Sequence, residues 1–387
     1  MFEFYFNTKV FYGANSCISA ILTILKNESW NKIGIVIDYN VSKTEAVNEL
    51  VFAIRNNCDK TIIDYCPISE PTYDFLDKVR TTFENQDLQA VVGIGGGSSL
   101  DTAKAIAVLV NNRNPAISYR GFNKMTEPVL PVVAIPTTAG TGSEVTPNAS
   151  FVDTIEKRKM GINGEAVRPR YAILDPGLTL SCPERPTISA GVDSIVHAVE
   201  AYTAKKTNPL ARMFAKEGLS YVLPNLSLVL KEPQNINYRE RVMNGAFLSG
   251  IALMNSGTGP AAAMSYPLGV HFKVPHGIAG GVFLPHVIRY NIEMGYYQYA
   301  DIYDCITDRD VSHKYNEQEK AQLFLKKILS LWKVLSIPDD LVKLGLKTDF
   351  MPQFIRETME LKGALDQNPV PFYEDGIVSV LKQLKVT

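Results

Sequence analysis

An aspartate and a histidine stand four residues apart in the segment GVDSIVHAVEAY, residues 191–202. The apolar residues around Asp193 and His197 recur with helical period, so both side chains should project from one helix face, one turn apart. A carboxylate and an imidazole that converge on one point provide half of a transition-metal site, or an acid–base pair. A third candidate is His276, which stands between a proline and a glycine, where the restricted backbone suits a fixed ligand.

The chain has only five histidines, and three of them lie in the stretch PLGVHFKVPHGIAGGVFLPHV. We interpret His286, which follows a proline, as a buried and hydrogen-bonded core residue. His313 lies in the polar segment DRDVSHKYN and is predicted to be exposed.

Two loops follow apolar strand-like runs. The first, Gly95-Gly96-Gly97-Ser98, opens a predicted helix, so its backbone can approach a phosphate at the positive end of the helix dipole. The second, TTAGTGSEVT at residues 137–146, is dense in small hydroxyl residues and suits a phosphate or ribose wall. The alternative for the first loop is a plain strand-to-helix turn.

Asp38 ends the run KIGIVI and is a candidate partner for a ribose 2′-hydroxyl, which would favour NAD over NADP by charge repulsion. The alternative is a turn or helix-capping aspartate. The glycines do not complete a G-x-G-x-x-G fingerprint, and the absence of Gly-Lys-Ser/Thr excludes a P-loop nucleotidase.

Strand and helix patterns alternate through the first half of the chain, which predicts a parallel, Rossmann-like sheet covered on both faces. Strands are predicted at residues 32–37, 61–65, 90–94, 132–135 and 171–174, and helices at 42–56, 72–84 and 99–110. The second half reads as helical, with helices at 189–204, 210–230, 238–253, 317–332 and 376–384. A proline-rich link at residues 182–186 separates the halves, so we predict an α/β dinucleotide-binding domain at 1–182 and an all-helical domain at 183–387.

Composition excludes several classes of protein. The chain of 387 residues is 46% apolar and 20% charged, with a net charge of −1 and interspersed signs, so no nucleic-acid or membrane partner is expected. Five scattered cysteines and the absence of a signal-like start favour a cytoplasmic protein with reduced thiols.

Taken together, the motifs resemble those of the iron-containing (group III) alcohol dehydrogenase family. GGGSSLDTAKAIA, PTTAGTGSEVTP, AGVDSIVHAVEAY, PLGVHFKVPHG and LPHVIRYN occur in the family's order, and the resemblance covers nearly the whole chain. It implies the dehydroquinate synthase-like architecture, an active site in the cleft between two domains, and NAD(P)-dependent interconversion of alcohols with aldehydes or ketones. It also implies a homodimer or larger homo-oligomer.

The family's functional residues are carried over by motif. The cofactor-binding positions would be Asp38, Gly95, Gly96, Gly97, Ser98, Asp101, Thr137, Thr138, Ser143, Asn148 and Lys159. The metal ligands, for iron or zinc, would be Asp193, His197 and His276.

Two positions depart from the family pattern. Ala262 stands where the fourth metal ligand is usually a histidine, fourteen residues before His276, and Tyr266 replaces a second family histidine. Three ligands can still hold a divalent ion with lower affinity. Alternatively the site is metal-free, and His197, His276 or Tyr266 supplies the proton. A swing of His271 into the site is a further, less favoured alternative.

We therefore expect an aldehyde reductase that uses NAD(H) in preference to NADP(H), with an altered, weak or absent metal site. The competing hypotheses are a dehydroquinate-synthase-like lyase, which would need a site rich in Lys and Arg, and a cofactor-binding paralogue without turnover.

Overall fold

The computed structural model describes residues 1–66 and 70–385, which form two compact units. The α/β unit contains Phe6–Pro183 and Gln234–Met243, and the helical unit contains Met1–Tyr5, Glu184–Pro233 and the chain from Asn244 onward. We retain as a proposal the domain boundary that the sequence predicts after residue 182.

A six-stranded sheet forms the centre of the α/β unit, and every strand pairs in parallel, as the alternating pattern predicts. Its order is β1-β9-β6-β4-β2-β3, with strands Lys9–Tyr12 (β1), Lys32–Asp38 (β2), Lys60–Cys66 (β3), Ala90–Gly95 (β4), Val132–Pro136 (β6) and Tyr171–Leu174 (β9). Since β3 lies on one side of β2 and β4 on the other, the strand order reverses between β2 and β4. Ligands of open α/β sheets bind at the carboxyl ends of the strands beside such a reversal.

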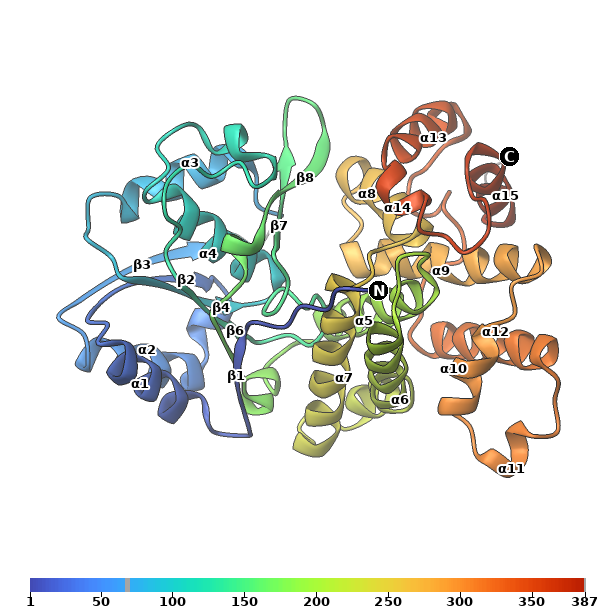
Figure 1. Ribbon diagram of the computed structural model, residues 1–387, viewed down its shortest axis with the longest axis horizontal. Coiled ribbons are helices and arrows are strands. Elements are labelled where there is room, and N and C mark those ends of the chain that lie inside the picture. Colours follow the sequence, from blue (N-terminus) through green and yellow to red (C-terminus); the bar gives the residue numbers. More distant parts are fainter. Residues whose placement is uncertain (67–69, 386–387) are drawn as a thin grey trace. The chain divides into compact units, whose positions relative to one another are not determined.

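Helices cover both faces of this sheet (Figure 1). Helices α1 (Cys17–Glu28) and α2 (Glu45–Asn56) lie on one face, and α3 (Tyr73–Phe83) and α4 (Gly97–Leu109) on the other. The alternation of β2 sends Ile33, Ile35 and Ile37 into the core beneath α1 and α2, and Val36 into the core beneath α3 and α4.

A second, three-stranded sheet was not predicted from the sequence. It has the order β5-β8-β7, with strands Gly121–Phe122 (β5), Asn148–Asp153 (β7) and Arg158–Asn163 (β8). Short 3₁₀ turns complete this unit at Val41–Lys43, Ala116–Tyr119, Glu165–Val167 and Pro176–Thr179. The first of these corrects the predicted helix start at residue 42, because α2 begins only at Glu45.

The helical unit is built around α5 (Glu184–Thr203), which packs against α6 (Pro209–Lys231) and α9 (His276–Glu293). Nearly all residues of α5 from Ala190 onward are buried, as expected of a helix enclosed by others. Helix α7 (Ile236–Met254) is divided between the units, because its residues up to Met243 belong to the α/β unit. The remaining helices of the helical unit are α8 (Pro260–Phe272), α10 (Tyr299–Cys305), α11 (Arg309–Ser312), α12 (Glu317–Val334), α13 (Met351–Glu360), α14 (Lys362–Leu365) and α15 (Glu374–Gln383), with a 3₁₀ turn at Thr348–Phe350.

The prediction of a proline-rich link at residues 182–186 is wrong for residues 184–186. Helix α5 already begins at Glu184 and contains Pro186 in its first turn. A proline is tolerated there because the first backbone N–H groups of a helix have no intrahelical partner.

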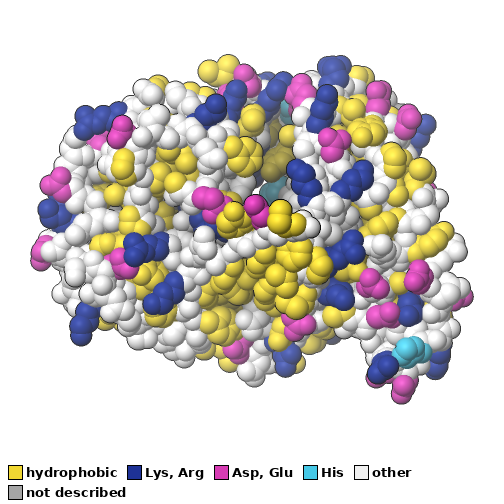
Figure 2. Space-filling model, viewed as in Figure 1, with side chains coloured by type: hydrophobic (Ala, Val, Ile, Leu, Met, Phe, Trp, Pro, Cys, Tyr) yellow, Lys and Arg dark blue, Asp and Glu magenta, His cyan; other side chains and the backbone are white. Residues whose placement is uncertain are grey.

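The surface agrees with the even charge pattern of the sequence. On the face drawn in Figure 2, acidic and basic side chains are interspersed and no large area carries a single sign. Among the described residues, no helix combines the length and the apolar character that crossing a membrane requires.

Candidate functional site

Asp193, His197 and His276 lie together within the helical unit, with their potential ligand atoms all within 4.8 Å of one another. The carboxylate of Asp193 is shared, because its Oδ1 lies 3.5 Å from Nε2 of His197 and 3.9 Å from Nε2 of His276. Asp193 and His197 are buried. The arrangement can hold a cation between the three side chains, or stabilise a protonated imidazole.

Two helices bring these residues together. Helix α5 supplies Asp193 and His197 from successive turns, and His276 is the first residue of α9. Gly277 explains the close approach of α9, since a Cβ there would clash with the backbone carbonyl of Ser189 and lie 2.9 Å from Cβ of Asp193. The glycine after His276 is therefore a packing requirement of the site.

Ser265 determines which nitrogen of the His276 ring carries the proton. Its hydroxyl Oγ lies 2.6 Å from the carbonyl oxygen of Ala262 and 3.2 Å from Nδ1 of His276. A carbonyl only accepts, so the hydroxyl proton goes to Ala262 and the serine oxygen accepts from Nδ1–H. In the neutral ring, Nε2 then carries the lone pair that faces Asp193. The ring of Tyr266 stacks on the same imidazole, with centroids 5.4 Å apart.

Glu200, which sequence reasoning missed, connects α5 to the start of α8. Its carboxylate accepts backbone N–H groups from Gly259 at 2.7 Å, Ala261 at 2.7 Å and Ala262 at 3.3 Å. These are the donors that a buried helix start leaves without partners. Glu200 thereby fixes the backbone of Ala262, the position at which the sequence lacks its fourth histidine.

Burial raises the pKa of Glu200 from 4.5 to about 7, although the three N–H groups act in the opposite direction. The folded state then binds this proton more tightly than the unfolded state, so stability falls as pH rises from about 4.5 to about 7. We expect Glu200→Gln to remove this fall, which amounts to about 3 kcal/mol. The measurement is the free energy of unfolding in urea at several pH values.

The matched control is Glu217→Gln, which removes an exposed carboxylate from α6. If the stability difference between the wild type and Glu200→Gln stayed constant from pH 4.5 to pH 7.5, the titration of Glu200 in this range would be refuted.

The predicted phosphate loop lies in the α/β unit, at the reversal of strand order. β2 ends at Asp38 and β4 at Gly95, and the two strands are neighbours in the sheet. A Cβ at Gly95 would lie 2.8 Å from Cβ of Asp38, and one at Gly97 would lie 2.6 Å from a methyl carbon of Thr141. The first contact places Asp38 against the loop, and the second shows that the two predicted cofactor loops pack together.

Polar contacts hold both loops in place. Asp101 accepts from the hydroxyl of Ser143 at 2.6 Å and from the backbone N–H of Ser150 at 2.9 Å. Buried Lys104 donates to the carbonyl oxygens of Thr146 at 3.0 Å and Asn148 at 2.8 Å, and burial lowers its pKa to about 8. Asp101 and Ser143 are thus engaged with each other, which favours a positioning role.

The remaining predicted cofactor residues have diverse surroundings. Thr137 is buried, and its hydroxyl has no hydrogen-bond partner in the part of the chain that the structure describes. Thr138 lies 3.4 Å from where a Cβ of Gly96 would stand. Asn148 begins β7, and Lys159 on β8 forms an ion pair with Glu70 at 2.9 Å.

Asp38 also has a capping role, because its Oδ1 accepts backbone N–H groups from Asn40 at 2.8 Å and Val41 at 3.1 Å. The capping alternative considered for this aspartate is therefore observed. It leaves Oδ2 available for a ligand.

The other histidines lie outside the cluster. His271, the alternative ligand, instead contacts Glu357 at 2.8 Å. His286 contacts Gln383 at 2.9 Å, so the predicted hydrogen bond is present, and burial lowers its pKa. Its side chain is only half-buried, so it is not the fully buried core residue that we predicted. His313 is exposed, as predicted.

Both predicted ligand classes fit the residues present. One carboxylate and two imidazoles form a donor set for a divalent transition metal, and buried Nδ1 of His197 has no hydrogen-bond partner among the described residues. At Gly95 and Gly97 the loop leaves no room for a Cβ, and the hydroxyl of neighbouring Thr137 has no hydrogen-bond partner among the described residues. This loop fits the diphosphate of a dinucleotide.

Comparisons with known proteins cover almost the whole chain. The family model "Iron-containing alcohol dehydrogenase" matches residues 7–176, and "Fe-containing alcohol dehydrogenase family, C-terminal" matches residues 187–385. The 1,3-propanediol dehydrogenase of Citrobacter freundii is 30% identical over 99% of this chain and 98% of its own.

Two further similarities extend this result. The NAD-dependent methanol dehydrogenase of Bacillus methanolicus is 39% identical over 54% of this chain and 55% of its own. The solved structure of a 1,3-propanediol oxidoreductase superposes with a TM-score of 0.93 at 28% identity, covering 99% of this chain and 100% of the other.

Proposed function

Because the chain belongs to the iron-containing alcohol dehydrogenase family, we propose that it acts as an aldehyde reductase, with NADH as the hydride donor. At the coarser level it is an enzyme, an NAD-dependent alcohol oxidoreductase. The observation that carries the proposal is the carboxylate of Asp193, shared by the two imidazoles of His197 and His276. Such a cluster can stabilise the negative oxygen that develops as hydride reaches a carbonyl carbon.

The α/β unit would bind the cofactor. Its diphosphate would lie on residues 95–98 at the start of α4, and its adenosine ribose near Asp38, whose carboxylate would repel the 2′-phosphate of NADP(H). Asp101 and Ser143 would hold the loops in position. Thr137, Thr138, Asn148 and Lys159 are proposed to line the rest of the cofactor site.

The helical unit would supply the proton that accompanies the hydride. Reduction of a carbonyl consumes one hydride and one proton, and the candidate proton donors are His197, His276 and Tyr266. Oδ1 of Asp193 lies within 4 Å of Nε2 of both imidazoles, and the ring of Tyr266 stacks on that of His276. The cofactor supplies hydride transfer, and a divalent ion, when bound, would polarise the substrate oxygen.

We propose that the cluster binds metal weakly, because Ala262 provides no ligand. The hydroxyl of Ser265 contacts both the carbonyl oxygen of Ala262 and Nδ1 of His276. This turn of α8 therefore lies next to the cluster. We expect Ala262→His to increase the affinity for Co²⁺ at least about tenfold, equal to about 1.4 kcal/mol. Calorimetric titration of metal-free protein measures it, and an unchanged or weaker affinity would show that residue 262 does not reach the ion.

Ser265→Ala should act in the opposite direction. Loss of the serine oxygen removes a hydrogen-bond acceptor for Nδ1–H of His276 and so weakens the constraint on the orientation of its ring. Such changes typically cost about 10- to 100-fold in metal affinity. The same Co²⁺ titration measures this effect, and thermal unfolding should be little changed because the alanine removes only one hydroxyl.

Ser249→Ala is the matched control, since Ser249 is equally buried but donates to the carbonyl of Gly245 within α7. Equal Co²⁺ affinities for Ser265→Ala and Ser249→Ala would remove the proposed role of Ser265.

The decisive test of the function combines metal analysis with turnover. Protein purified without chelators is analysed for iron and zinc, and NADH and NADPH oxidation is followed with a panel of aldehydes and ketones. We expect aldehyde-dependent NADH oxidation, a preference for NADH, and less than one metal per chain. Tight NADH binding without oxidation by any carbonyl compound would instead indicate a paralogue without turnover.

We also propose a homodimer or larger assembly. Strand β1 ends the six-stranded order, so one of its edges is open within this sheet. Sedimentation equilibrium tests the proposal, and a monomer at micromolar concentration would contradict it.

A further inference from the structure

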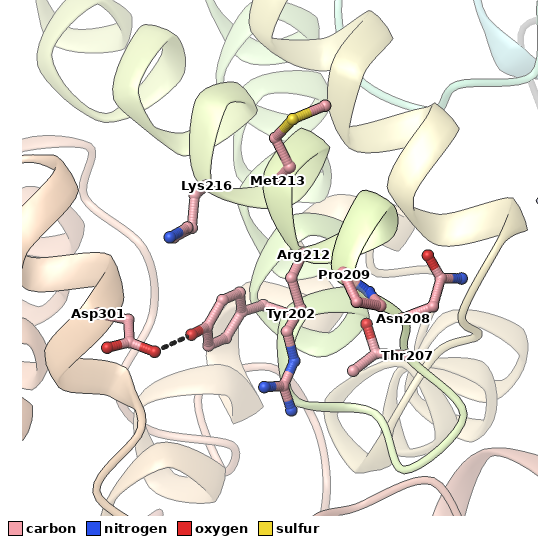
Figure 3. A pocket seen from close by; sticks show the side chains of 8 residues that line it. All are labelled: Tyr202, Thr207, Asn208, Pro209, Arg212, Met213, Lys216 and Asp301. Carbon is pink, nitrogen blue, oxygen red and sulfur yellow. Dashed lines mark hydrogen bonds between the residues drawn. The ribbon is translucent and has the colours of Figure 1, made fainter. Parts of the chain in front are cut away.

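A pocket of about 540 Å³ lies in the helical unit, lined by residues other than the Asp193–His197–His276 cluster. Side chains from α5, α6, α10 and the loop before α6 surround it (Figure 3). Its lining consists of Tyr202, Thr207, Asn208, Pro209, Arg212, Met213, Lys216 and Asp301. This volume lies within the range of about 300–1,000 Å³ that is typical of small-molecule sites.

Two cations, Arg212 and Lys216, line this pocket. Arg212 and Lys216 are four residues apart on α6, so their side chains project from one helix face. In the described parts of the chain, neither has a carboxylate within 4.0 Å of its charged nitrogens. The buried Nε of Arg212 and the buried hydroxyl of Thr207 also lack hydrogen-bond partners there.

The one acid in the lining is already engaged. Asp301 accepts the phenol proton of Tyr202, with 2.5 Å between Oδ2 and the phenol oxygen. Burial, followed by this contact, raises the pKa of Tyr202, so the phenol stays neutral. The pocket therefore has two positive charges against one negative charge, and Oδ1 of Asp301 remains able to accept a hydroxyl.

Part of the lining is apolar. Pro209, Met213 and the ring of Tyr202 offer carbon surface, and Asn208 caps the first turn of the 23-residue helix α6. The positive end of that long helix adds to the attraction for an anion.

We propose that this pocket binds a small organic phosphomonoester that carries a free hydroxyl. The phosphate contacts Arg212, Lys216 and the hydroxyl of Thr207, whose side chains have no hydrogen-bond acceptor among the described residues. The carbon skeleton lies against Tyr202 and Met213, and the free hydroxyl donates to Asp301. Tyr202 stands five residues after His197 in the same helix, so the ligand would contact the helix that carries the cluster.

The test uses calorimetric titration of the full chain with glycerol 3-phosphate and, separately, with inorganic phosphate at equal ionic strength. The variant Arg212→Gln/Lys216→Gln is compared with Lys343→Gln/Lys347→Gln, which removes two exposed lysines of the same unit. We expect saturable binding of glycerol 3-phosphate that weakens at least about tenfold in the first variant and is unchanged in the second. Only the binding lost in the first variant is assigned to the pocket, because the glycine loop of the α/β unit can also hold phosphate.

Arg212 lies over the ring of Tyr202, 5.2 Å from its centroid, so its loss can disturb packing. Lys216→Gln alone is therefore the second variant, and a smaller loss in the same direction is expected. Equal affinities in all variants, or no saturable binding, would overturn the site. Equal affinity for glycerol 3-phosphate and inorganic phosphate would refute the proposed contacts with the carbon skeleton, and the pocket would then be a site for free phosphate.

Discussion

Replacing Asp193 by asparagine is expected to lower kcat/KM for NADH-dependent aldehyde reduction by about 10²- to 10⁴-fold. The carboxylate lies 3.5 Å from His197 and 3.9 Å from His276, so it stabilises positive charge on both rings or on an ion between them. The amide has nearly the same size but no charge. The loss is therefore expected whether the cluster works with a metal or with a protonated imidazole.

Steady-state kinetics measures this effect, and NADH affinity should stay unchanged because the cofactor loops belong to the other unit. Asp366→Asn, at an exposed position of the helical unit, is the control for loss of one carboxylate. A folded Asp193→Asn enzyme with kcat/KM within twofold of the wild type would remove Asp193 from the proposed site.

The cluster could be predicted because its key spacing is local. Residues four apart on a helix meet on one face, so the sequence alone brings Asp193 and His197 together. His276 is distant in sequence, and only its place between Pro275 and Gly277 and the family resemblance pointed to it. The packing of α9 on α5, which requires Gly277, is a tertiary fact that no local pattern contains.

Ser265 and Glu200 could not be assigned roles from the sequence for the same reason. Ser265 reaches His276 across the turn between α8 and α9, and Glu200 caps a helix that begins about sixty residues later. A signal did exist for Glu200, which follows His197 by three residues and shares its helix face. Its position on the helix face that carries two predicted ligands indicated that this carboxyl group could also have a role near the site.

The α/β unit shows where pattern reading succeeds and where it fails. Strands β2, β4, β6 and β9 are mostly buried apolar runs, and their bounds were predicted within one residue. β7 and β8 pair antiparallel and carry polar residues on an exposed face, so NASFVD and RKMGIN lack the β-branched runs that signalled the other strands. The hairpin carries Asn148 and Lys159, two residues that we propose line the cofactor site.

Gly95→Ala should be the most damaging single change in the α/β unit. Gly95 has a φ of +147°, which L-residues rarely adopt, and a Cβ there would lie 2.8 Å from Cβ of both Asp38 and Ser99. The loop must shift to relieve these contacts, and it would then lose the close backbone approach that a diphosphate needs. We expect the Kd for NADH, measured by fluorescence titration, to rise about 100-fold, equal to about 2.7 kcal/mol.

The matched control is Gly363→Ala in α14, where a Cβ would meet no atom within 4 Å. It should leave the Kd for NADH unchanged and at most stabilise the helix. The Co²⁺ affinity of Gly95→Ala shows whether the substitution disturbs only the loop or the whole protein. The Asp193 cluster belongs to the helical unit, so its affinity should be unchanged if the effect is local. If Gly95→Ala bound NADH as tightly as Gly363→Ala did, the diphosphate would have to bind away from this loop, and the cofactor assignment of residues 95–98 would be withdrawn.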